Sequence, residues 1–486
     1  MMPLRELLNP LQIVVAEDCN IESICLDSRE VSDGSLFFAY PGSVVDGRDF
    51  IEQAIERGAA AIVYEAISDQ SSAFTLSENT GIPAYAVVDL QSRLGLIAAQ
   101  FYGKPSQELQ VFGVTGTNGK TSCCTLLAQA FEIMGLSAAV IGTLGSGSLG
   151  ELAYAGQTTP DPIKLQEILR ECADAGVTQV CIEVSSHALD QGRVAGVDFF
   201  CTLFTNLTRD HLDYHGDMQT YLSAKQSLFS QYPSELSIIN IADPAGANII
   251  DAAAAQFLVS YGLGGDVFAE KVHLKNDGIE LEIEGNGVSF DVSVPLVGEI
   301  NVPNIELLIA SLLSLSVAVD DIVEICRQLK PAPGRMELYK SDNGVSIVVD
   351  FAHTPDALQK ALSSVRRHCS GKVVCVFGCG GDRDKGKRAL MGAAADQSAD
   401  LVIVTNDNPR SESADAIAAD IVAGIKGDYR LELDRAAAID MAISQAQEND
   451  WVVVAGKGHE TTQEINGQLI EFSDRAYIES IIQVAA

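Results

Sequence analysis

Residues 113–121 read Gly-Val-Thr-Gly-Thr-Asn-Gly-Lys-Thr, a combination of glycines, lysine and hydroxyl residue that is typical of phosphate-binding loops. An apolar run precedes this loop and a helical pattern follows it, which argues against the alternative of an ordinary turn with a surface lysine. The spacing departs from the strict motif, because Val114 occupies the position of its first glycine. We predict that Lys120 contacts the β- and γ-phosphates of ATP and that the Thr121 hydroxyl binds Mg²⁺. The predicted loop contacts are Gly116, Thr117, Asn118, Gly119, Lys120 and Thr121.

Acidic and imidazole side chains follow two further predicted strands. Glu183 lies in the apolar run 180–184 just before Ser-Ser-His, and the polar segment 205–215 contains His211 among other charged residues. The carboxyl ends of parallel strands face the ligand in α/β sheets, and Mg²⁺ prefers oxygen ligands. Salt bridges, helix caps or a solvated loop explain the same residues about as well. Lys225, taken by itself, indicates only an exposed lysine on a helix.

Three polar loops in the last third of the chain also follow predicted strands. Residues 380–388 form a basic cluster, residues 407–410 read Asp-Asn-Pro-Arg, and residues 456–460 read Gly-Lys-Gly-His-Glu. Loops of this kind meet at one edge of a doubly wound sheet. Arg410 is suited to bind a carboxylate there, because its planar guanidinium presents two parallel donors. The basic cluster alone is also compatible with a solvated loop.

The apolar pattern predicts an α/β protein of three domains, with boundaries at residues 1–105, 106–331 and 332–486. We expect a small N-terminal α/β domain, a central P-loop-type ATPase domain with a mainly parallel sheet, and a C-terminal Rossmann-like domain. Residues 270–297 alternate around Asn-Asp-Gly and Gly-Asn-Gly, which predicts antiparallel hairpins flanking the parallel sheet. The predicted strands are 35–40, 60–64, 84–88, 111–114, 180–184, 199–205, 238–241, 346–351, 372–377, 401–405 and 451–455.

Composition narrows the classes of function. The 486 residues carry a formal net charge of −34, which argues against binding to nucleic acid or anionic membranes because phosphate surfaces would be repelled. A phosphorylated substrate must therefore be held by local cationic pockets or metal ions. The eleven cysteines include no CxxC pair and indicate buried, reduced thiols. The N-terminus lacks the apolar core of a signal peptide, and the apolar run 307–319 is too short to cross a bilayer and predicts a buried helix, so we expect a cytoplasmic protein.

Six motifs, which lie between residues 115 and 356, together resemble the Mur ligases. They are residues 115–121, 183–187, 206–215, 298–304 (Gly-Glu-Ile-Asn-Val-Pro-Asn), 334–337 (Gly-Arg-Met-Glu) and 350–356 (Asp-Phe-Ala-His-Thr-Pro-Asp). Asp-Asn-Pro-Arg is the form found in members that add diaminopimelate, whereas lysine-adding members lack the arginine. The resemblance implies an ATP- and Mg²⁺-dependent ligase of peptidoglycan precursor synthesis. It would add meso-2,6-diaminopimelate to the D-Glu γ-carboxylate of UDP-N-acetylmuramoyl-L-Ala-D-Glu through an acyl phosphate.

The same resemblance implies roles for individual residues. Lys225 corresponds to a lysine that the family carbamylates, which turns a cation into a carboxylate. Gln157 and Phe351 depart from the more common Asn and Tyr. The implied catalytic residues are Lys120, Glu183, His211 and Lys225, and the implied Mg²⁺ ligands are Thr121, Glu183, His211 and carbamylated Lys225. Asn301, Asn304, Arg335 and Asp350 would join the ATP site, and Ser28, Thr158, Thr159, Ser185, Gln191 and Arg193 would bind the UDP-muramoyl-dipeptide. Arg383, Asp407, Asn408, Arg410, Gly456 and Glu460 would bind diaminopimelate, with Glu460 accepting its distal amine.

Two other functions remain open. A folylpolyglutamate synthetase shares the ligase fold and phosphate loop, but its pterin substrate gives no reason for the first domain or for Asp-Asn-Pro-Arg. A nucleotide-dependent partner-binding module would leave Lys225 and His211 without a role. We expect a monomer that closes its domains over small substrates. Leaving Arg410 or Glu460 unpaired beside lysine would cost about 1–3 kcal/mol, which favours diaminopimelate.

Overall fold

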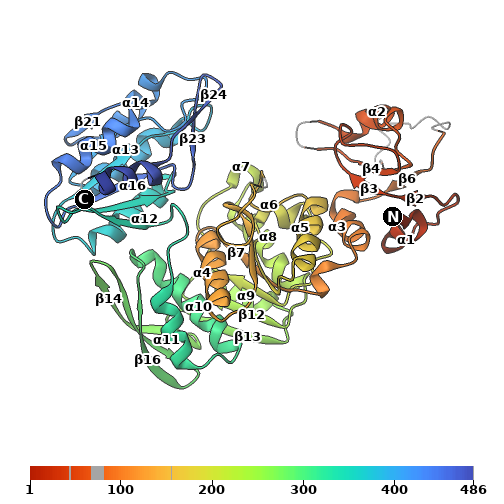
Figure 1. Cartoon of the computed structure of the whole chain (residues 1–486), viewed down its shortest axis with the longest axis horizontal. Coiled ribbons are helices and arrows are strands. Elements are labelled where there is room, and N and C mark those ends of the chain that lie inside the picture. Colours follow the sequence, from red (N-terminus) through yellow and green to blue (C-terminus); the bar gives the residue numbers. More distant parts are fainter. Residues whose placement is uncertain (43–44, 67–80, 155, 485–486) are drawn as a thin grey trace. The chain divides into compact units, whose positions relative to one another are not determined.

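The computed structural model describes residues 1–42, 45–66, 81–154 and 156–484, and Figure 1 labels its elements. The chain packs as two compact units. The first comprises Met1–Lys120, Gly135–Ile239 and Pro244–Leu258, and the second comprises Thr121–Met134, Asn240–Asp243 and Val259–Ala486.

The N-terminal part of the first unit is a four-stranded parallel sheet in the order β3-β4-β5-β6. Glu65, at the end of β5, accepts hydrogen bonds from the backbone N–H groups of Asp89 (2.8 Å) and Leu90 (2.7 Å). These bonds satisfy two amides at the start of helix α3 that have no partner within the helix. The elements are β1 (Met2–Pro3), α1 (Leu4–Leu7), β2 (Asn20–Ile21), β3 (Ser23–Cys25), β4 (Ser35–Ala39), α2 (Ile51–Glu56), β5 (Ala61–Glu65), β6 (Ala84–Val87) and α3 (Leu90–Phe101).

The rest of the first unit is built on parallel strands in the order β12-β11-β7-β10-β8, with β9 antiparallel at the edge. The chain leaves β7 toward β8 and β10 and then crosses to β11 on the other side of β7. This change of side is a topological switch point, where α/β sheets bind ligands beyond the carboxyl ends of their strands. The strands are β7 (Gln110–Thr115), β8 (Ala138–Gly142), β9 (Gly145–Gly147), β10 (Gln179–Glu183), β11 (Cys201–Phe204) and β12 (Leu236–Asn240).

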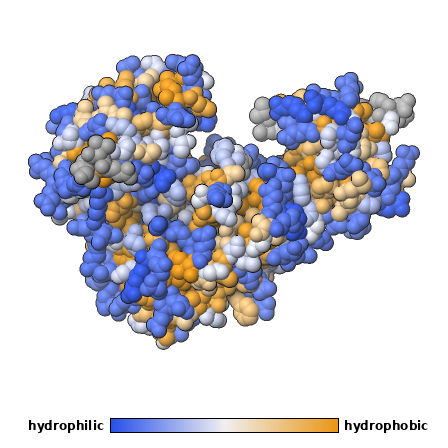
Figure 2. All heavy atoms as spheres, in the orientation of Figure 1, coloured by the Kyte–Doolittle hydropathy of each residue, from blue (hydrophilic) through white to orange (hydrophobic). Residues whose placement is uncertain are grey.

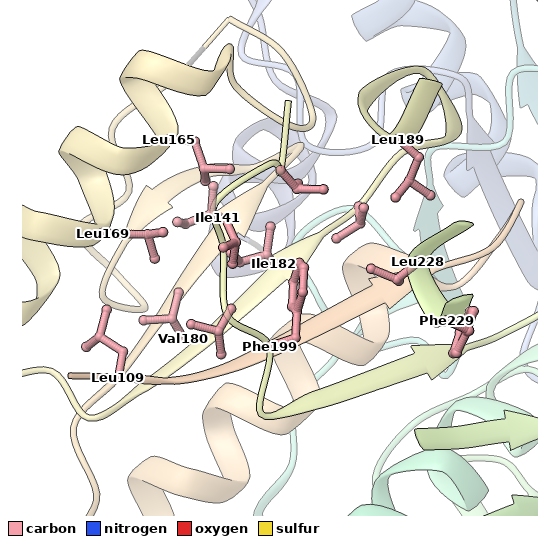
Figure 3. Close-up of a cluster of buried hydrophobic side chains, with 14 of the residues drawn as sticks. Leu109, Ile141, Leu165, Leu169, Val180, Ile182, Leu189, Phe199, Leu228 and Phe229 are labelled. Atoms are coloured by element: carbon pink, nitrogen blue, oxygen red, sulfur yellow. The ribbon is translucent and has the colours of Figure 1, made fainter. Parts of the chain in front are cut away.

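Apolar side chains pack against this sheet in one buried cluster. Figure 3 shows Leu165 and Leu169 together with Val180 and Ile182, all within one buried cluster. Val180 pairs with Val111 and Cys201 pairs with Phe112, so the ends of β10, β7 and β11 lie level with one another. The helices of this part are α5 (Pro162–Asp174), α6 (Ser186–Asp190), α7 (Leu212–His215), α8 (Met218–Ser230) and α9 (Gly246–Ala252).

The second unit contains the predicted hairpins and the helix that follows the phosphate loop. Strands β14, β15 and β16 pair antiparallel, as the alternation in 270–297 predicts. The predicted single helix at 307–319 is wrong in extent, because α10 ends at Ser314 and Ser316 has a φ of 61°, which breaks the helix before α11. The elements are α4 (Lys120–Ile133), β13 (Phe257–Tyr261), β14 (Val267–Lys275), β15 (Gly278–Gly285), β16 (Val288–Val294), α10 (Val302–Ser314) and α11 (Val319–Gln328).

The C-terminal part of the second unit is a six-stranded sheet in the order β17-β18-β22-β19-β20-β21, in which only β17 is antiparallel. Buried clusters form from alternate residues of its strands, so Val348 and Ile347 belong to different cores. All four predicted strands are confirmed, whereas β17, β21 and the hairpin β23–β24 were not predicted. The elements are β17 (Glu337–Lys340), β18 (Ser346–Asp350), α12 (Pro355–Arg366), β19 (Val373–Phe377), α13 (Gly386–Ser398), β20 (Leu401–Val404), α14 (Ala414–Val422), β21 (Tyr429–Leu431), α15 (Arg435–Gln445), β22 (Trp451–Ala455), β23 (Thr462–Ile465), β24 (Gln468–Glu471) and α16 (Asp474–Val484).

The surface and the cysteines agree with the composition. Hydrophilic residues cover much of the face seen in Figure 2. All eleven cysteines are free thiols, and only Cys19 and Cys369 are not buried. Within the described ranges, no helix combines the length and apolarity required to cross a membrane.

Candidate active site

The lysine of the phosphate loop is hydrogen-bonded to backbone carbonyl groups of the same loop. Lys120 donates from Nζ to the carbonyl oxygens of Gly116 (2.7 Å) and Thr117 (2.9 Å). Gly116 has a φ of 150°, and a Cβ at this position would lie 1.8 Å from Thr205 Oγ1. Only glycine is therefore compatible with this turn. Because these hydrogen bonds hold the ammonium group of Lys120 at the loop, it already lies where phosphate oxygens would bind.

The loop after β11 is hydrogen-bonded to the phosphate loop. Asn206 accepts two hydrogen bonds, from Thr117 N at its carbonyl oxygen (2.8 Å) and from Asn118 N at its side-chain oxygen (2.9 Å). Thr205 Oγ1 donates to the carbonyl oxygen of Asn118 (2.7 Å). Two of the sequence motifs thus form one structure at the switch point of the sheet.

Glu183 is a buried carboxylate at the end of β10. Its oxygens accept hydrogen bonds from Thr143 N (2.8 Å) and Thr143 Oγ1 (3.3 Å), and Thr143 Oγ1 also lies 3.1 Å from Thr158 Oγ1. Thr159 Oγ1 donates to the carbonyl oxygen of Glu183 (2.7 Å) and accepts from Ser185 N (3.1 Å). The residues predicted for the metal and for the muramoyl substrate therefore adjoin each other here.

Three histidines and a tyrosine pack together beside this carboxylate-bearing strand. The ring centre of His187 lies 4.9 Å from that of His211, 4.2 Å from that of Tyr214 and 5.5 Å from that of His215. Burial and the neighbouring His211 lower the pKa of His187 to about 4. Partial burial also lowers the pKa of His211; Asp210 opposes this change, and Lys120 and Lys225 add to it. Both imidazoles are therefore neutral at pH 7, the form in which imidazole binds a metal ion.

Lys225 is not the exposed helix lysine that its local sequence indicates. Its side chain is 1% exposed, and Nζ lies 4.5 Å from the ring centre of Tyr221. Burial, with repulsion from Lys120, holds the pKa of the Lys225 amine well below its ordinary value. A neutral buried amine is a nucleophile, which is the property that carbamylation requires.

The donor set fits Mg²⁺ that is shared between protein and nucleotide. Mg²⁺ commonly uses one or two carboxylates together with substrate phosphates and water. Glu183 supplies one carboxylate, and a carbamate on Lys225 would supply a second. Across the part of the chain that the structure describes, no group of three or more His, Cys, Asp or Glu side chains is arranged to hold a metal by itself. The chemistry of the donors thus agrees with an ion that is completed by ATP.

Among the residues predicted for the UDP-muramoyl-dipeptide, Thr159 and Gln191 are hydrogen-bonded to Arg193. Its guanidinium donates to Thr159 O (2.8 Å), to Gln157 Oε1 and, through two nitrogens, to Gln191 Oε1 (2.6 and 2.9 Å). Gln191 Nε2 donates to the Tyr214 hydroxyl (3.1 Å), and that hydroxyl donates to Asp190 Oδ2 (2.6 Å). Gln157, which stands where the family more often has Asn, thus makes a polar contact with Arg193.

A cavity of about 420 Å³ opens next to this network, a volume in the range of ligand sites. Gln191 is the predicted substrate contact that lines it. Ser28 is not among its lining residues, and its hydroxyl instead donates to Gln53 Oε1 (2.6 Å). The lining residues are Tyr40, Pro41, Glu65, Asp89, Gln91, Ser92, Asp190 and Gln191.

In the second unit, the two asparagines predicted for adenine contact each other. Asn304 Nδ2 donates to Asn301 Oδ1 (3.0 Å), and Asn301 Nδ2 donates to the carbonyl oxygen of Val297 (2.8 Å). Cys123 of α4 donates to Asn304 Oδ1 (3.3 Å). The helix that begins at the phosphate loop therefore packs directly against the predicted adenine contacts.

Arg335 and Asp350 lie at the start of the C-terminal domain. The Arg335 guanidinium lies 4.5 Å from the ring centre of Phe351, so the Phe that replaces a common Tyr acts as a cation–π partner. Asp350 accepts hydrogen bonds from Met336 N (2.8 Å) and Ala352 N (2.9 Å). Burial raises the pKa of Asp350, and Arg335 opposes that rise.

The residues predicted for diaminopimelate converge at the carboxyl ends of β20 and β22. Asn408 Nδ2 donates to Glu460 Oε2 (2.8 Å), and Lys457 Nζ lies 2.9 Å from the same oxygen. Asp407 adjoins Gly456, because a Cβ on that glycine would lie 2.6 Å from Asp407 Oδ2. Arg410 joins this group through the hydrogen bond from Glu464 N to Asn408 Oδ1 (3.0 Å) and its own contact with Glu464.

The basic cluster 380–388 divides into two kinds of residue. Arg383 is exposed and its Cγ lies 3.8 Å from a Cβ built on Gly380. Arg388 is buried and pairs with Glu412 (2.8 Å) and Asp420 (2.9 Å), so its role is structural. The cluster is therefore neither wholly a solvated loop nor wholly a binding surface.

Several residues at these sites were not singled out in the sequence. Thr143 orients Glu183, Tyr214 links Gln191 to Asp190, and Lys457 is a fully buried cation beside Glu460. Glu464 lies on Arg410. Lys457 could have been found from the sequence, because it lies between two glycines of the Gly-Lys-Gly-His-Glu loop at the end of a predicted strand. The other three carry no local signal, because each acts on a residue distant in sequence.

Comparison with known proteins agrees with this geometry. Three family profiles match in succession: a Mur ligase family catalytic domain at 20–102, a Mur ligase middle domain at 114–312 and a Mur ligase glutamate ligase domain at 334–458. The chain is 44% identical over 481 residues to the UDP-N-acetylmuramoyl-L-alanyl-D-glutamate–2,6-diaminopimelate ligase of Coxiella burnetii, covering 97% of each chain. It is 42% identical over 469 residues to the enzyme of the same name from Haemophilus influenzae, covering 94% of this chain and 95% of that one.

A solved structure described as a UDP-N-acetylmuramoyl-L-alanyl-D-glutamate–2,6-diaminopimelate ligase matches 99% of both chains, with a TM-score of 0.71 and 34% identity. The three profiles confirm the predicted order of domains, while the boundaries at 105/106 and 331/332 stay predictions. On the evidence of profiles, near-full-length identity and fold, the chain belongs to the Mur ligase family.

Proposed function

We propose that the chain is the ATP-dependent ligase that joins meso-2,6-diaminopimelate to the D-Glu γ-carboxylate of UDP-N-acetylmuramoyl-L-Ala-D-Glu, with release of ADP and phosphate. The observation that carries the substrate choice is Arg410, beside Asn408 and Glu460 at the carboxyl edge of the C-terminal sheet. Arginine is matched to a carboxylate and glutamate to an ammonium group, the two groups at the distal end of diaminopimelate. Near-full-length identity to two ligases of that name supports the same conclusion.

The first chemical step activates the carboxylate. A γ-carboxylate oxygen of the D-Glu residue attacks the γ-phosphorus of ATP, ADP leaves, and an acyl phosphate remains. Lys120 is held at the phosphate loop and offsets the charge that develops on the phosphates. Thr121, Glu183, His211 and carbamylated Lys225 would hold Mg²⁺, which supplies further charge stabilisation when bound.

The second step forms the amide. The amine of diaminopimelate attacks the acyl carbon, and phosphate leaves from the tetrahedral intermediate. The amine must lose a proton, and His353 is a candidate base because desolvation by the surrounding protein, with Lys387 and Arg335, lowers its pKa and keeps the imidazole neutral. His353 Nδ1 lies 2.8 Å from the carbonyl oxygen of Phe351, which favours the tautomer that leaves Nε2 as the acceptor.

The net charge and the cysteines of the chain indicate the compartment of the reaction and the kind of substrate. Free cysteines throughout the chain support a reducing compartment, the cytoplasm. A net charge of −34 opposes binding to nucleic acid, so the substrates are small molecules gathered by local cations. We expect a monomer.

The two alternatives account for less of the chain. A folylpolyglutamate synthetase activity does not explain a first domain that matches a Mur ligase profile at 20–102. A partner-binding module gives no reason for a buried lysine, Lys225, beside the phosphate loop.

ADP release by the purified protein with Mg²⁺, ATP and UDP-N-acetylmuramoyl-L-Ala-D-Glu tests the proposal, with meso-diaminopimelate and L-lysine compared as amines. We expect turnover with diaminopimelate, and a loss of about 30-fold or more in kcat/KM for that amine in Arg410→Gln. Preference for lysine would contradict the substrate assignment. Absence of ADP release with both amines would contradict the ligase itself.

A further inference from the structure

The carboxylate of Glu464 lies on Arg410, where the proposed function requires a carboxylate of the substrate. Glu464 Oε2 is 3.1 Å from Arg410 Nε, and Arg410 Nη1 donates to the carbonyl oxygen of Gly381 (2.8 Å). The pair is accessible, since 23% of the Arg410 side chain and 39% of the Glu464 side chain are exposed. In the free protein Arg410 therefore already has an anionic partner.

Backbone hydrogen bonds fix Glu464 at this place. Arg410 N donates to the carbonyl oxygen of Glu464 (2.9 Å), and Asn466 N donates to the carbonyl oxygen of Arg410 (2.7 Å). Glu464 N donates to Asn408 Oδ1 (3.0 Å). The hairpin β23–β24 is thus attached to the Asp-Asn-Pro-Arg loop by its main chain, and any side chain at position 464 emerges beside the guanidinium.

The Arg410–Glu464 contact is weaker than the one a substrate carboxylate can make. Glu464 meets Arg410 through one nitrogen, Nε, whereas a free carboxylate can meet an arginine through two parallel hydrogen bonds. We propose that Glu464 is a specificity-determining residue, which occupies Arg410 in the empty site and is displaced when the distal carboxylate of diaminopimelate binds. This inference rests on the proposed function.

Displacement of Glu464 has consequences for affinity and for selection. Diaminopimelate must separate Glu464 from Arg410 and bind near its negative charge, which raises the KM for this amine. L-Lysine lacks the distal carboxylate and leaves the pair intact, so Glu464 removes much of the penalty expected from an unpaired Arg410 beside lysine. Glu464 therefore narrows the preference for diaminopimelate over lysine.

Glu464→Gln tests the proposal, because glutamine keeps the shape and the backbone hydrogen bonds but removes the charge. We expect the KM for meso-diaminopimelate to fall about two- to fivefold, the range for a partly exposed ion pair, with kcat unchanged. The constant for L-lysine, measured as a substrate or as a competitive inhibitor, should rise, because lysine then binds beside an Arg410 that has lost its anionic partner. Glu471→Gln on the exposed strand β24 is the matched control and should leave the KM for diaminopimelate unchanged.

A KM for diaminopimelate that is unchanged or higher in Glu464→Gln would overturn the inference, because Glu464 would then be inert or would orient Arg410 for binding. An equal fall in Glu471→Gln would overturn it as well, since general charge rather than the contact would be responsible. These outcomes are separate from a failure of the proposed function, which is decided by whether the unaltered protein turns over diaminopimelate at all.

Discussion

Arg435 and Asp474 form an ion pair with two hydrogen bonds, each 2.7 Å long, and both side chains are completely buried. Arg435 also donates to the carbonyl oxygens of Asn406 and Ala455, each at 3.0 Å. Asn406 immediately precedes Asp407 and Asn408, and Ala455 immediately precedes Gly456. The pair therefore fixes both loops that carry the proposed diaminopimelate contacts.

Asp474→Asn should destabilise the protein by about 3–5 kcal/mol, because it leaves the buried Arg435 cation without a compensating charge. Urea unfolding measures this loss. Asp356→Asn is the control, since Asp356 forms an exposed i,i+4 pair with Lys360 and its loss should cost less than about 1 kcal/mol. Equal small losses in both variants would show that the Arg435–Asp474 pair is not structurally important.

Gly116→Ala should strongly weaken ATP binding. A Cβ at Gly116 would lie 1.8 Å from Thr205 Oγ1 and about 3 Å from Asn206 backbone atoms, so the phosphate loop must shift. We expect ATP affinity, measured by calorimetry, to fall about 100-fold or more. Gly264→Ala is the control, because Gly264 also has a positive φ but no atom within 4 Å of its Cβ position. Normal ATP binding by Gly116→Ala would contradict the assignment of the loop.

The sequence predicted those parts of the site in which function and local pattern coincide. The phosphate loop and the Asp-Asn-Pro-Arg loop follow strands whose apolar runs are unambiguous, and Glu183 ends such a strand. Each predicted strand is confirmed. Lys225 was different. Its local sequence indicates an exposed lysine, and only the family resemblance assigned it a role; the structure shows it buried.

The remaining features of the fold and the site could not be predicted from the sequence, because they depend on contacts between residues that are distant in the chain. Glu464 meets Arg410 through a hairpin, β23–β24, that was not predicted, and β24 is wholly exposed, so it lacks the alternation that marks a half-buried strand. The charge pattern of 380–388 likewise cannot reveal that Arg388 is paired with Glu412 and Asp420.

Acid should destabilise the protein through its histidines. Burial lowers the pKa of His459 to about 4, and the pKa of His187 is lowered to a similar value. Between pH 6.5 and 4 the unfolded chain therefore binds protons that the folded protein does not. Their contribution to stability is present above pH 6.5 and is lost as the pH falls toward 4.

Urea unfolding at pH 7, 5.5 and 4.5 measures this effect, and each histidine should contribute up to about 1.4 kcal/mol per pH unit in this window. His459→Gln should reduce the slope by as much as one proton, because glutamine does not titrate. An unchanged slope in His459→Gln would contradict the assignment of a lowered pKa to His459.

Lys225 should be indispensable as a carbamate rather than as a cation. Burial holds its pKa well below the ordinary value and so favours the neutral amine, whose lone pair can attack CO₂, with loss of a proton, to give an anionic carbamate. We expect Lys225→Ala to lower kcat about 100-fold or more, and Lys360→Ala, at an exposed position, to leave kcat unchanged. Acetate or formate should partly restore Lys225→Ala, because a small carboxylate can enter the space left by the side chain and replace the carbamate. Methylamine should not restore it. Restoration by methylamine and not by acetate would mean that the positive charge of Lys225 is what the reaction uses.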